Sequence, residues 1–143
     1  MSILIPVHNF NAAQLISDLQ KQARELTVTW EIIVVDDASQ RETGWFDNIE
    51  ELEGVSLHHN DHNLGRAATR NKLADLAKGR WLLMVDCDAQ VVASDFLQRF
   101  VDVAPSNKVV CGQIRHPEQL PAASVSLRWR YEKEAERRMH PSM

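Results

Sequence analysis

Two carboxylates separated by one residue carry the clearest chemical signal in the sequence. Asp86 and Asp88 follow apolar residues 81–85, which predict a strand buried on both faces. Side chains two residues apart in an extended chain point to the same side, so both acids can address one site while Cys87 faces away. Two close carboxylates repel each other unless a cation or hydrogen-bond donors neutralise them. The pair therefore suits Mg²⁺ or Mn²⁺ bound together with substrate phosphates, and the alternative is two solvated acids at a strand end.

Polar side chains also lie at the ends of two earlier predicted strands, which cover residues 2–6 and 31–37. These side chains are His8, Asn9, Asp36 and Asp37. The acids of the second strand suit a ribose hydroxyl or a nucleobase N–H, because carboxylates accept hydrogen bonds. If the strand order is 3-2-1-4, all of these groups converge with Asp86 and Asp88 on one crevice at the carboxyl ends of the strands.

Apolar periodicity predicts that strands and helices alternate along the chain. The predicted strands cover residues 2–6, 31–37, 55–58, 81–86 and 108–112. The predicted helices cover residues 11–26, 43–52, 66–78, 94–104 and 121–139. This alternation indicates βαβ units, and therefore an α/β domain with a mostly parallel sheet.

Several side chains have predicted places in these elements. Asn11 and Ser94 are positioned to cap the helices that follow them, and Gly79 is positioned to end the third helix. Cys111 is expected to be buried in the last strand. The inward face of the third helix is predicted to contain Ala67, Ala68, Leu73, Leu76 and Ala77. A four-spaced apolar stripe on the last helix contains Leu127, Tyr131, Ala135 and Met139.

The composition bounds the class of protein. A chain of 143 residues is long enough for about one domain with its own core. The formal net charge of −4 offers no basic surface for nucleic acid. No apolar run approaches the roughly 20 residues of a membrane span, and the first residues lack the basic start of a signal peptide. The two cysteines make no disulfide framework, so a reduced, cytoplasmic location is expected.

The usual glycine-rich phosphate-binding motifs are absent from the sequence. The first predicted strand is not followed by G-x-G-x-x-G, and there is no P-loop. A phosphate group would need another source of positive charge. A metal at Asp86 and Asp88 would supply it, as would Arg66 or Arg70 on the third helix. The pattern indicates a nucleoside diphosphate held by acids at one end and by a metal at the other.

Four motifs lie in order along the chain, in residues 2–9 (SILIPVHN), 31–39 (EIIVVDDAS), 63–79 (NLG, ATRN and AKG) and 85–88 (VDCD). Together they resemble the family 2 glycosyltransferases of the GT-A fold. The resemblance implies a Rossmann-like α/β domain with a mostly parallel sheet flanked by helices. It also implies transfer of a sugar, with inversion, from a nucleotide-diphosphate donor to an acceptor hydroxyl, with a UDP-sugar as the favoured donor.

The resemblance also implies roles for individual residues. Asp37 would contact the nucleobase with Asp36 close by, and Arg70 would lie near the donor. Asp86 would lie by the ribose or the sugar, and Asp88, with Asp86, would bind Mn²⁺ or Mg²⁺ at the diphosphate. The residues expected to line the base and ribose are Pro6, Val7, His8 and Asn9. The chain departs from the family where His8 replaces a tyrosine and where Ala89 and Gln90 replace a third acid.

The chain is expected to contain only the donor-binding portion of such an enzyme, cut short before the acceptor half. Residues 1–115 would form the nucleotide-sugar-binding core, and residues 116–143 a helical segment that begins the acceptor half. The family's catalytic base lies in a later acidic motif that no acid of the last helix matches, so no base is assigned. The acceptor would be a glycan or a lipid-linked sugar, as in polysaccharide biosynthesis, at the membrane periphery or in the cytoplasm. The apolar stripe of the last helix could mediate self-association.

Other interpretations use the same residues. A non-catalytic nucleotide-sugar-binding module would share the site and lack only the base. A phospho-receiver domain also combines acids with Mg²⁺, but its acid pair follows the first strand and its lysine ends a late strand, whereas Lys108 precedes one here. A zinc site could form from His58, His59 and His62, although a solvated loop explains them more simply. Cys87 has no base beside it and is not expected to be a nucleophile.

Overall fold

The chain divides into two compact units, Met1–Lys108 and Val109–Met143. The computed structural model describes residues 1–40, 43–106, 109–112, 119 and 126–139. The predicted domain boundary at residue 115 lies outside these residues and stays a prediction. No helix in the described part of the chain is long and apolar enough to cross a membrane.

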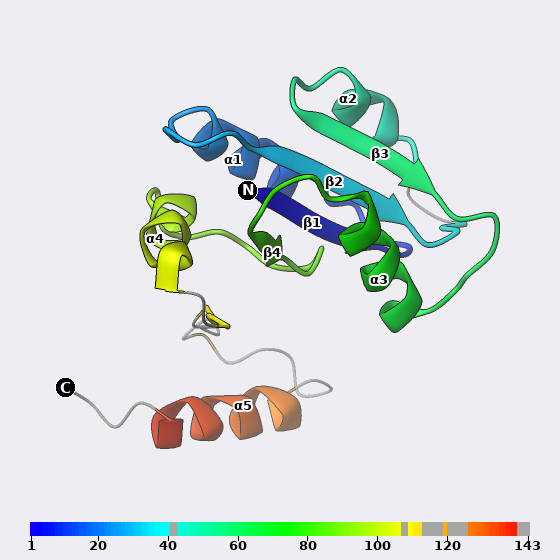
Figure 1. Cartoon of the computed structure of the whole chain (residues 1–143). Coiled ribbons are helices and arrows are strands. Elements are labelled where there is room, and N and C mark those ends of the chain that lie inside the picture. Colours follow the sequence, from blue (N-terminus) through cyan, green and yellow to red (C-terminus); the bar gives the residue numbers. More distant parts are fainter. Residues whose placement is uncertain (41–42, 107–108, 113–118, 120–125, 140–143) are drawn as a thin grey trace. The chain divides into compact units, whose positions relative to one another are not determined.

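The first unit is built on a parallel sheet whose strands have the order β3-β2-β1-β4 (Figure 1). The four strands are β1 (Ser2–Val7), β2 (Glu31–Asp36), β3 (Val55–His59) and β4 (Leu82–Met84). All three pairings are parallel, and the register places Val7 of β1 opposite Asp36 of β2. The predicted α/β class is therefore confirmed, and the observed order is the one under which the polar strand ends were expected to converge.

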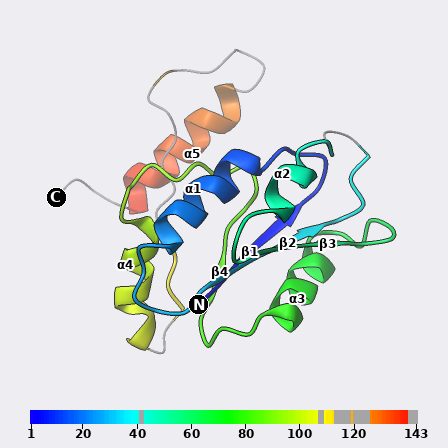
Figure 2. The ribbon, with the colours of Figure 1, turned by 90° about the horizontal axis from the view of Figure 1, so that it is seen from above.

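Helices cover both faces of this sheet. They are α1 (Ala13–Ala23), α2 (Phe46–Glu50), α3 (Arg66–Leu76) and α4 (Phe96–Val103), followed by a 3₁₀ turn, η1 (Ala104–Ser106). In the view from above, α3 lies on one side of the sheet, and α1, α2 and α4 lie on the other (Figure 2). The second unit contains α5 (Ser126–Met139).

Alternate residues of β1 and β2 fill two separate cores. The larger core lies on the side of α1, α2 and α4, where Ile3, Ile5, Ile32 and Val34 face apolar side chains of these helices. The smaller core contains Leu4, Ile33, Val35 and Leu73 of α3. Because neighbouring residues of a strand point to opposite faces, two strands that are apolar at nearly every position must be covered on both sides.

Both predicted helix caps are off by one residue. The cap residue of α1 is Ala12, and Asn11, one position earlier, still accepts the N–H of Ala13 on its Oδ1 at 3.0 Å. The cap residue of α4 is Asp95 instead of Ser94, and its side chain makes no capping hydrogen bond.

The prediction that the strand at residues 81–86 is buried on both faces is wrong. β4 contains only Leu82–Met84, and Leu82 and Met84 are 50% and 37% exposed. Both side chains lie on the α3 side of the sheet, but α3 packs over β1 and β2 instead. Leu83, on the other face, packs against the larger core. A strand at the edge of the sheet is thus covered on one face only.

The inward face of α3 differs in part from the prediction. Ala67 and Ala68 are exposed, whereas Thr69 and Leu73 are buried. Leu76 and Ala77 pack against the smaller core as predicted. The helix also ends at Leu76, before Gly79, whose N–H donates to the hydroxyl of Ser2 at 2.8 Å.

The predicted strand over residues 108–112 is wrong in its described part, because residues 109–112 form no strand. Cys111, which was expected to be buried, is exposed. A strand needs a hydrogen-bonded neighbour, and a short apolar run does not specify one. The last helix is confirmed from Ser126 onward, with Leu127 and Tyr131 exposed.

Candidate functional site

The carboxyl ends of β1 and β2 hold the first cluster of predicted site residues together. The N–H of Asp37 donates to the carbonyl of Val7 at 2.8 Å, which extends the pairing of the two strands by one residue. The Nδ1 atom of His8 lies 2.8 Å from the carbonyl oxygen of Asp37. These bonds join the loop after β1 to the loop after β2 at the edge where ligands bind in open parallel sheets.

The turn after β2 is closed by Asp36. Its carboxylate accepts the N–H of Ser39, at 3.2 Å to each oxygen, and lies 3.3 Å from Nδ1 of His59 on β3. Between these residues Ala38 adopts a φ of 55°, a left-handed conformation that costs an alanine about 1–2 kcal/mol. Such local strain persists only where the surroundings fix it, and it is common at binding sites.

Asp37 is buried, and both oxygens of its carboxylate accept hydrogen bonds. Oδ1 accepts the side-chain amide of Asn60 at 2.7 Å and the N–H of Leu64 at 2.8 Å, and Oδ2 accepts the N–H of Gly65 at 2.9 Å. Burial alone would raise the pKa of Asp37, but these donors, with the Thr69 hydroxyl, outweigh it and lower the pKa. Asp37 therefore fixes the loop between β3 and α3, and the predicted contact with a nucleobase stays a prediction.

Asn9 connects the same two loops a second time. Its N–H donates to the Ser39 hydroxyl at 2.7 Å, and its Oδ1 accepts the N–H of Gln40 at 2.8 Å. A φ of 52° at Asn9 turns the chain out of β1, a conformation that asparagine tolerates better than most residues. The neighbouring Val7 is buried in the larger core, so only its main chain can line a ligand.

Arg70 and Asp86 form an ion pair between α3 and the segment after β4. Nη2 of Arg70 donates to Oδ1 of Asp86. Nε of Arg70 is buried and, within the described residues, has no hydrogen-bond acceptor. A buried N–H without a partner costs about 1–3 kcal/mol, so it is the partly exposed remainder of this guanidinium that can meet a ligand oxygen.

Asp88 lies on a turn, because the N–H of Ala89 donates to the carbonyl of Asp86 at 3.0 Å. The extended geometry assumed for the two acids is therefore wrong, since β4 ends at Met84. Both acids are nevertheless exposed, and Cys87 between them is half-buried against the larger core. Burial and the adjacent carboxylates raise the pKa of the Cys87 thiol, which disfavours the nucleophilic thiolate.

A divalent cation would find only part of its ligands in the protein. Among the described side chains, no group of three or more His, Cys, Asp or Glu could hold a metal, and this includes His58, His59 and His62. Asp88 makes no ion pair with any described residue, whereas Asp86 is engaged by Arg70. The acids fit a cation that takes its remaining ligands from phosphate oxygens and water, as Mg²⁺ often does.

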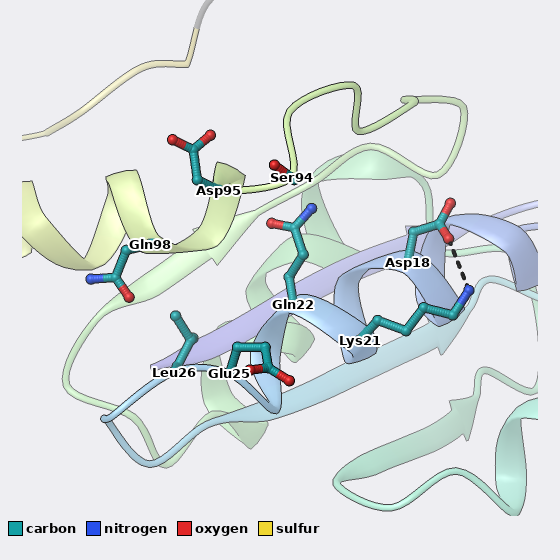
Figure 3. A pocket seen from close by; sticks show the side chains of 8 residues that line it. All are labelled: Asp18, Lys21, Gln22, Glu25, Leu26, Ser94, Asp95 and Gln98. Carbon is teal, nitrogen blue, oxygen red and sulfur yellow. Dashed lines mark hydrogen bonds and ion pairs between the residues drawn. The ribbon is translucent and has the colours of Figure 1, made fainter.

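A separate hollow of about 480 Å³ lies between α1 and α4 (Figure 3). It is lined by Asp18, Lys21, Gln22, Glu25, Leu26, Ser94, Asp95 and Gln98. None of the predicted site residues borders it. The side chain of Gln22 joins the two helices there, donating to the Ala93 carbonyl and accepting the N–H of Leu97.

Comparison with known protein families decides the relationship. The model of the family described as "Glycosyl transferase family 2" matches residues 2–140. The chain belongs to glycosyl transferase family 2. The family predicted from the four motifs is thereby confirmed.

Curated relatives of this family 2 chain are considerably longer. It is 33% identical over 79 residues to "Dolichyl-phosphate beta-glucosyltransferase ALG5D" of Trichomonas vaginalis, covering 54% of this chain and 24% of the relative. It is 31% identical over 90 residues to an uncharacterized glycosyltransferase of Haemophilus influenzae, covering 62% and 29%. The chain thus spans about a quarter of the length of these relatives.

Solved structures share the fold of this family 2 chain. S. aureus TarS in complex with UDP matches 83% of this chain and 38% of its own, with a TM-score of 0.57 and 20% identity. The mannosyltransferase PcManGT of Pyrobaculum calidifontis, solved with GDP-Man and Mn²⁺, matches 70% and 30%, with a TM-score of 0.54 and 26% identity. The likeness confirms the predicted α/β, GT-A fold.

Four residues that support the candidate site had no predicted role, namely Ser39, Asn60, Thr69 and Lys72. Asn60 is buried between Asp37 and Thr69, and Lys72 holds it by donating to its Oδ1 at 2.6 Å. Ser39 receives the N–H of Asn9. A serine two residues after an aspartate at a strand end is a recognisable turn signal, whereas a buried asparagine in a polar loop carries none.

Proposed function

We propose that the carboxyl ends of β1, β2 and β4 bind a nucleotide-diphosphate sugar, with a UDP-sugar as the favoured donor. The observation that carries this proposal is the strand order β3-β2-β1-β4, which puts His8, Asn9, Asp36 and Asp37 at one edge of the sheet. Complexes of TarS with UDP and UDP-GlcNAc, and of PcManGT with GDP-Man, support a nucleotide sugar as the ligand class.

The nucleoside would lie over the loops after β1 and β2. Pro6, His8 and Asn9 would line the base and ribose, together with the main chain of Val7. Asp37 has little hydrogen-bonding capacity left, so its main contribution would be to hold the loop that faces the base. Base recognition would then fall chiefly to the exposed polar groups around Asp36–Asp37, including the main chain of the strained turn at Ala38.

Arg70 and Asp86 would contact the donor beyond the nucleoside. The partly exposed guanidinium of Arg70 would donate to a ribose or phosphate oxygen, and Asp86 would accept a ribose or sugar hydroxyl with its second oxygen. The ion pair keeps both side chains in place before the ligand arrives, which lowers the entropy lost on binding.

Asp88 would hold Mn²⁺ or Mg²⁺ at the diphosphate, joined by Asp86 if that carboxylate moves from Arg70. The cation, when bound, neutralises the charge of the leaving diphosphate. The Mn²⁺ in the PcManGT structure supports this choice of metal class. Asp88 is exposed and makes no ion pair within the described residues, so none of those contacts has to break before it binds such an ion.

A protein that joins this portion to an acceptor-binding half would transfer the sugar, with inversion, to a hydroxyl of a glycan or of a lipid-linked acceptor. The name of the Trichomonas relative includes dolichyl phosphate, a lipid phosphate, and this supports an acceptor carried on a lipid. A carboxylate base from the acceptor half would remove the hydroxyl proton as it attacks. A non-catalytic nucleotide-sugar-binding module is the second candidate, and family membership favours either one over a phospho-receiver domain.

The first experiment is a calorimetric titration of UDP into the 143-residue chain with and without Mn²⁺. Binding should depend on the metal and should weaken by at least roughly 10- to 100-fold in Asp88→Ala, the scale on which metal sites respond to loss of a supporting group. Asp75→Ala removes an exposed carboxylate of α3 and is the matched control. Equal affinity in wild type and Asp88→Ala would remove the metal assignment.

The activity of a longer chain distinguishes a transferase from a non-catalytic binding module. We expect a chain extended by an acceptor-binding half to release UDP from a UDP-sugar in the presence of acceptor. The 143-residue chain should bind UDP with little turnover. Rapid multiple turnover by the short chain would show that the base lies within it. Binding without turnover in the long chain would favour the module.

A further inference from the structure

The ring of His8 contacts the loops after β2 and before α3, and these contacts select one of its two neutral tautomers. Its Nδ1 is 2.8 Å from the main-chain oxygen of Asp37. A carbonyl oxygen can only accept, so Nδ1 must carry the hydrogen. In a neutral imidazole with hydrogen on Nδ1, Nε2 is an acceptor.

An amide donor occupies that acceptor. Nδ2 of Asn9 lies 2.9 Å from Nε2 of His8. The orientation of this amide is set independently, because its Oδ1 accepts the N–H of Gln40 at 2.8 Å. The Asn9 amide therefore cannot rotate to present oxygen to a protonated Nε2 without losing its bond to Gln40.

A second amide faces the same ring from the loop before α3. Nδ2 of Asn63 lies 3.3 Å from Nε2 and 3.4 Å from Nδ1 of His8. Its Oδ1 accepts the N–H of Gly65 at 2.9 Å, so its orientation is fixed as well. An N–H carries positive partial charge, which a neutral ring accommodates and an imidazolium opposes.

We propose that His8 is a positioning residue that must be neutral, with hydrogen on Nδ1, for the loops at residues 8–9, 37–40 and 63–65 to keep the shape that binds nucleotide. This inference rests on the proposed nucleotide-binding function. Protonation of Nε2 puts a third N–H against two amide donors whose orientations are already set. The loops then separate, and the affinity for UDP falls as the pH is lowered.

His8 is exposed, and the described carboxylates near it make no hydrogen bond or ion pair with its ring. The carboxylate of Asp37 points to the N–H groups of Leu64 and Gly65, Asp86 is paired with Arg70, and Asp88 is exposed to solvent. The Cys87 thiol contacts the main chain of His8 rather than its ring, and its raised pKa keeps it protonated. Within the described residues, no carboxylate accepts a hydrogen bond from the ring.

The decisive test is nuclear magnetic resonance of the His8 ring and of the loop amides in the absence of nucleotide. At pH 8 the ring nitrogen shifts should show hydrogen on Nδ1, the less common neutral form. As the pH is lowered from 8 to 5, the Asn9 side-chain amide and the Gln40 and Gly65 N–H signals should move together with the signals of the His8 ring. The proposal would be overturned if the neutral ring carries its hydrogen on Nε2, or if the amide signals stay constant while the signals of the His8 ring change.

Two variants carry the test to ligand binding. His8→Asn keeps an N–H near the position of Nδ1 and does not titrate, whereas His62→Asn removes an exposed histidine of the neighbouring loop. Wild type and His62→Asn should lose about three- to tenfold more UDP affinity than His8→Asn between pH 8 and 5.5, the effect of about one hydrogen bond. The phosphate of UDP titrates equally in all three proteins. Identical pH profiles would overturn the coupling to binding, while absence of UDP binding at pH 8 would count against the proposed function and leave the ring and amide results to decide the role of His8.

Discussion

Asp37 illustrates how strongly the role of a single carboxylate depends on what surrounds it. From the sequence it is an acid at a strand end, available to a ligand. In the folded chain it is 5% exposed and accepts hydrogen bonds from the loop between β3 and α3. Its lowered pKa means that the folded state favours the ionised carboxylate more than the unfolded state does. Its contribution to stability is therefore complete above the usual carboxyl pKa and is lost as the pH falls through the folded value.

We expect Asp37→Asn to lower the free energy of unfolding by about 1.5–3 kcal/mol at pH 7, since an amide cannot accept from donors on both of its atoms. The deficit should shrink as the pH falls below about 4, because the unfolded chain then takes up a proton that folded Asp37, with its lowered pKa, does not yet bind. Urea denaturation at pH 7 and pH 3 measures both effects. Asp61→Asn, in an exposed position of the same loop, should stay within about 0.5 kcal/mol of wild type. A deficit that is the same size at pH 3 would contradict the electrostatic explanation.

At the scale of elements, the sequence predicts best what is buried from both sides. β1 and β2 are central strands whose apolar runs match their two-sided burial, and the alternation of strands and helices predicted that their pairing is parallel. β4 has an equally apolar sequence, but its exposure depends on the position of α3. The local sequence of β4 does not predict that position. The acids of the site were likewise visible in the sequence. Their donors at Asn60 and Leu64 were not, because a loop brings them in from distant positions.

The junction between α3 and β4 shows a contact that sequence periodicity does not reveal. A Cβ placed on Gly79 would lie 2.6 Å from the Ser2 hydroxyl and 2.7 Å from the Ser2 nitrogen. The main chain of β1 cannot move away without disturbing the sheet. The Ser2 hydroxyl also accepts the N–H of Gly79 and donates to Glu31 at 2.6 Å, so the close approach joins three elements.

Gly79→Ala should therefore destabilise the fold by about 1–3 kcal/mol, the usual cost of forcing an extra carbon into a packed region. Gly44→Ala is the matched control, because a Cβ at Gly44 would meet no atom within 4 Å. That control should be neutral or up to about 1 kcal/mol more stable, since it reduces the freedom of the unfolded chain. Midpoints of thermal and urea unfolding compare the two variants, and equal stability of both would refute the close-packing argument.

For the whole molecule, the remaining question is what covers the apolar side chains of α5. An isolated helix of 14 residues is marginal in water, because helices shorter than about 12–15 residues gain too little to offset nucleation. Leu127 and Tyr131, one turn apart, are 81% and 75% exposed. Burying them against a second copy of α5 would stabilise the helix and remove apolar surface from water.

We therefore expect the 143-residue chain to self-associate through α5, with helicity that rises with protein concentration. Sedimentation equilibrium and far-ultraviolet circular dichroism, measured over a hundredfold range of concentration, should change together. Leu127→Lys should abolish both changes, because it places a charge in the apolar contact. Leu82→Lys tests the other exposed apolar element, β4, and should leave association intact. If Leu82→Lys alone produces monomers, the edge of the sheet is the contact, since its unpaired main chain would then be the surface that joins the copies.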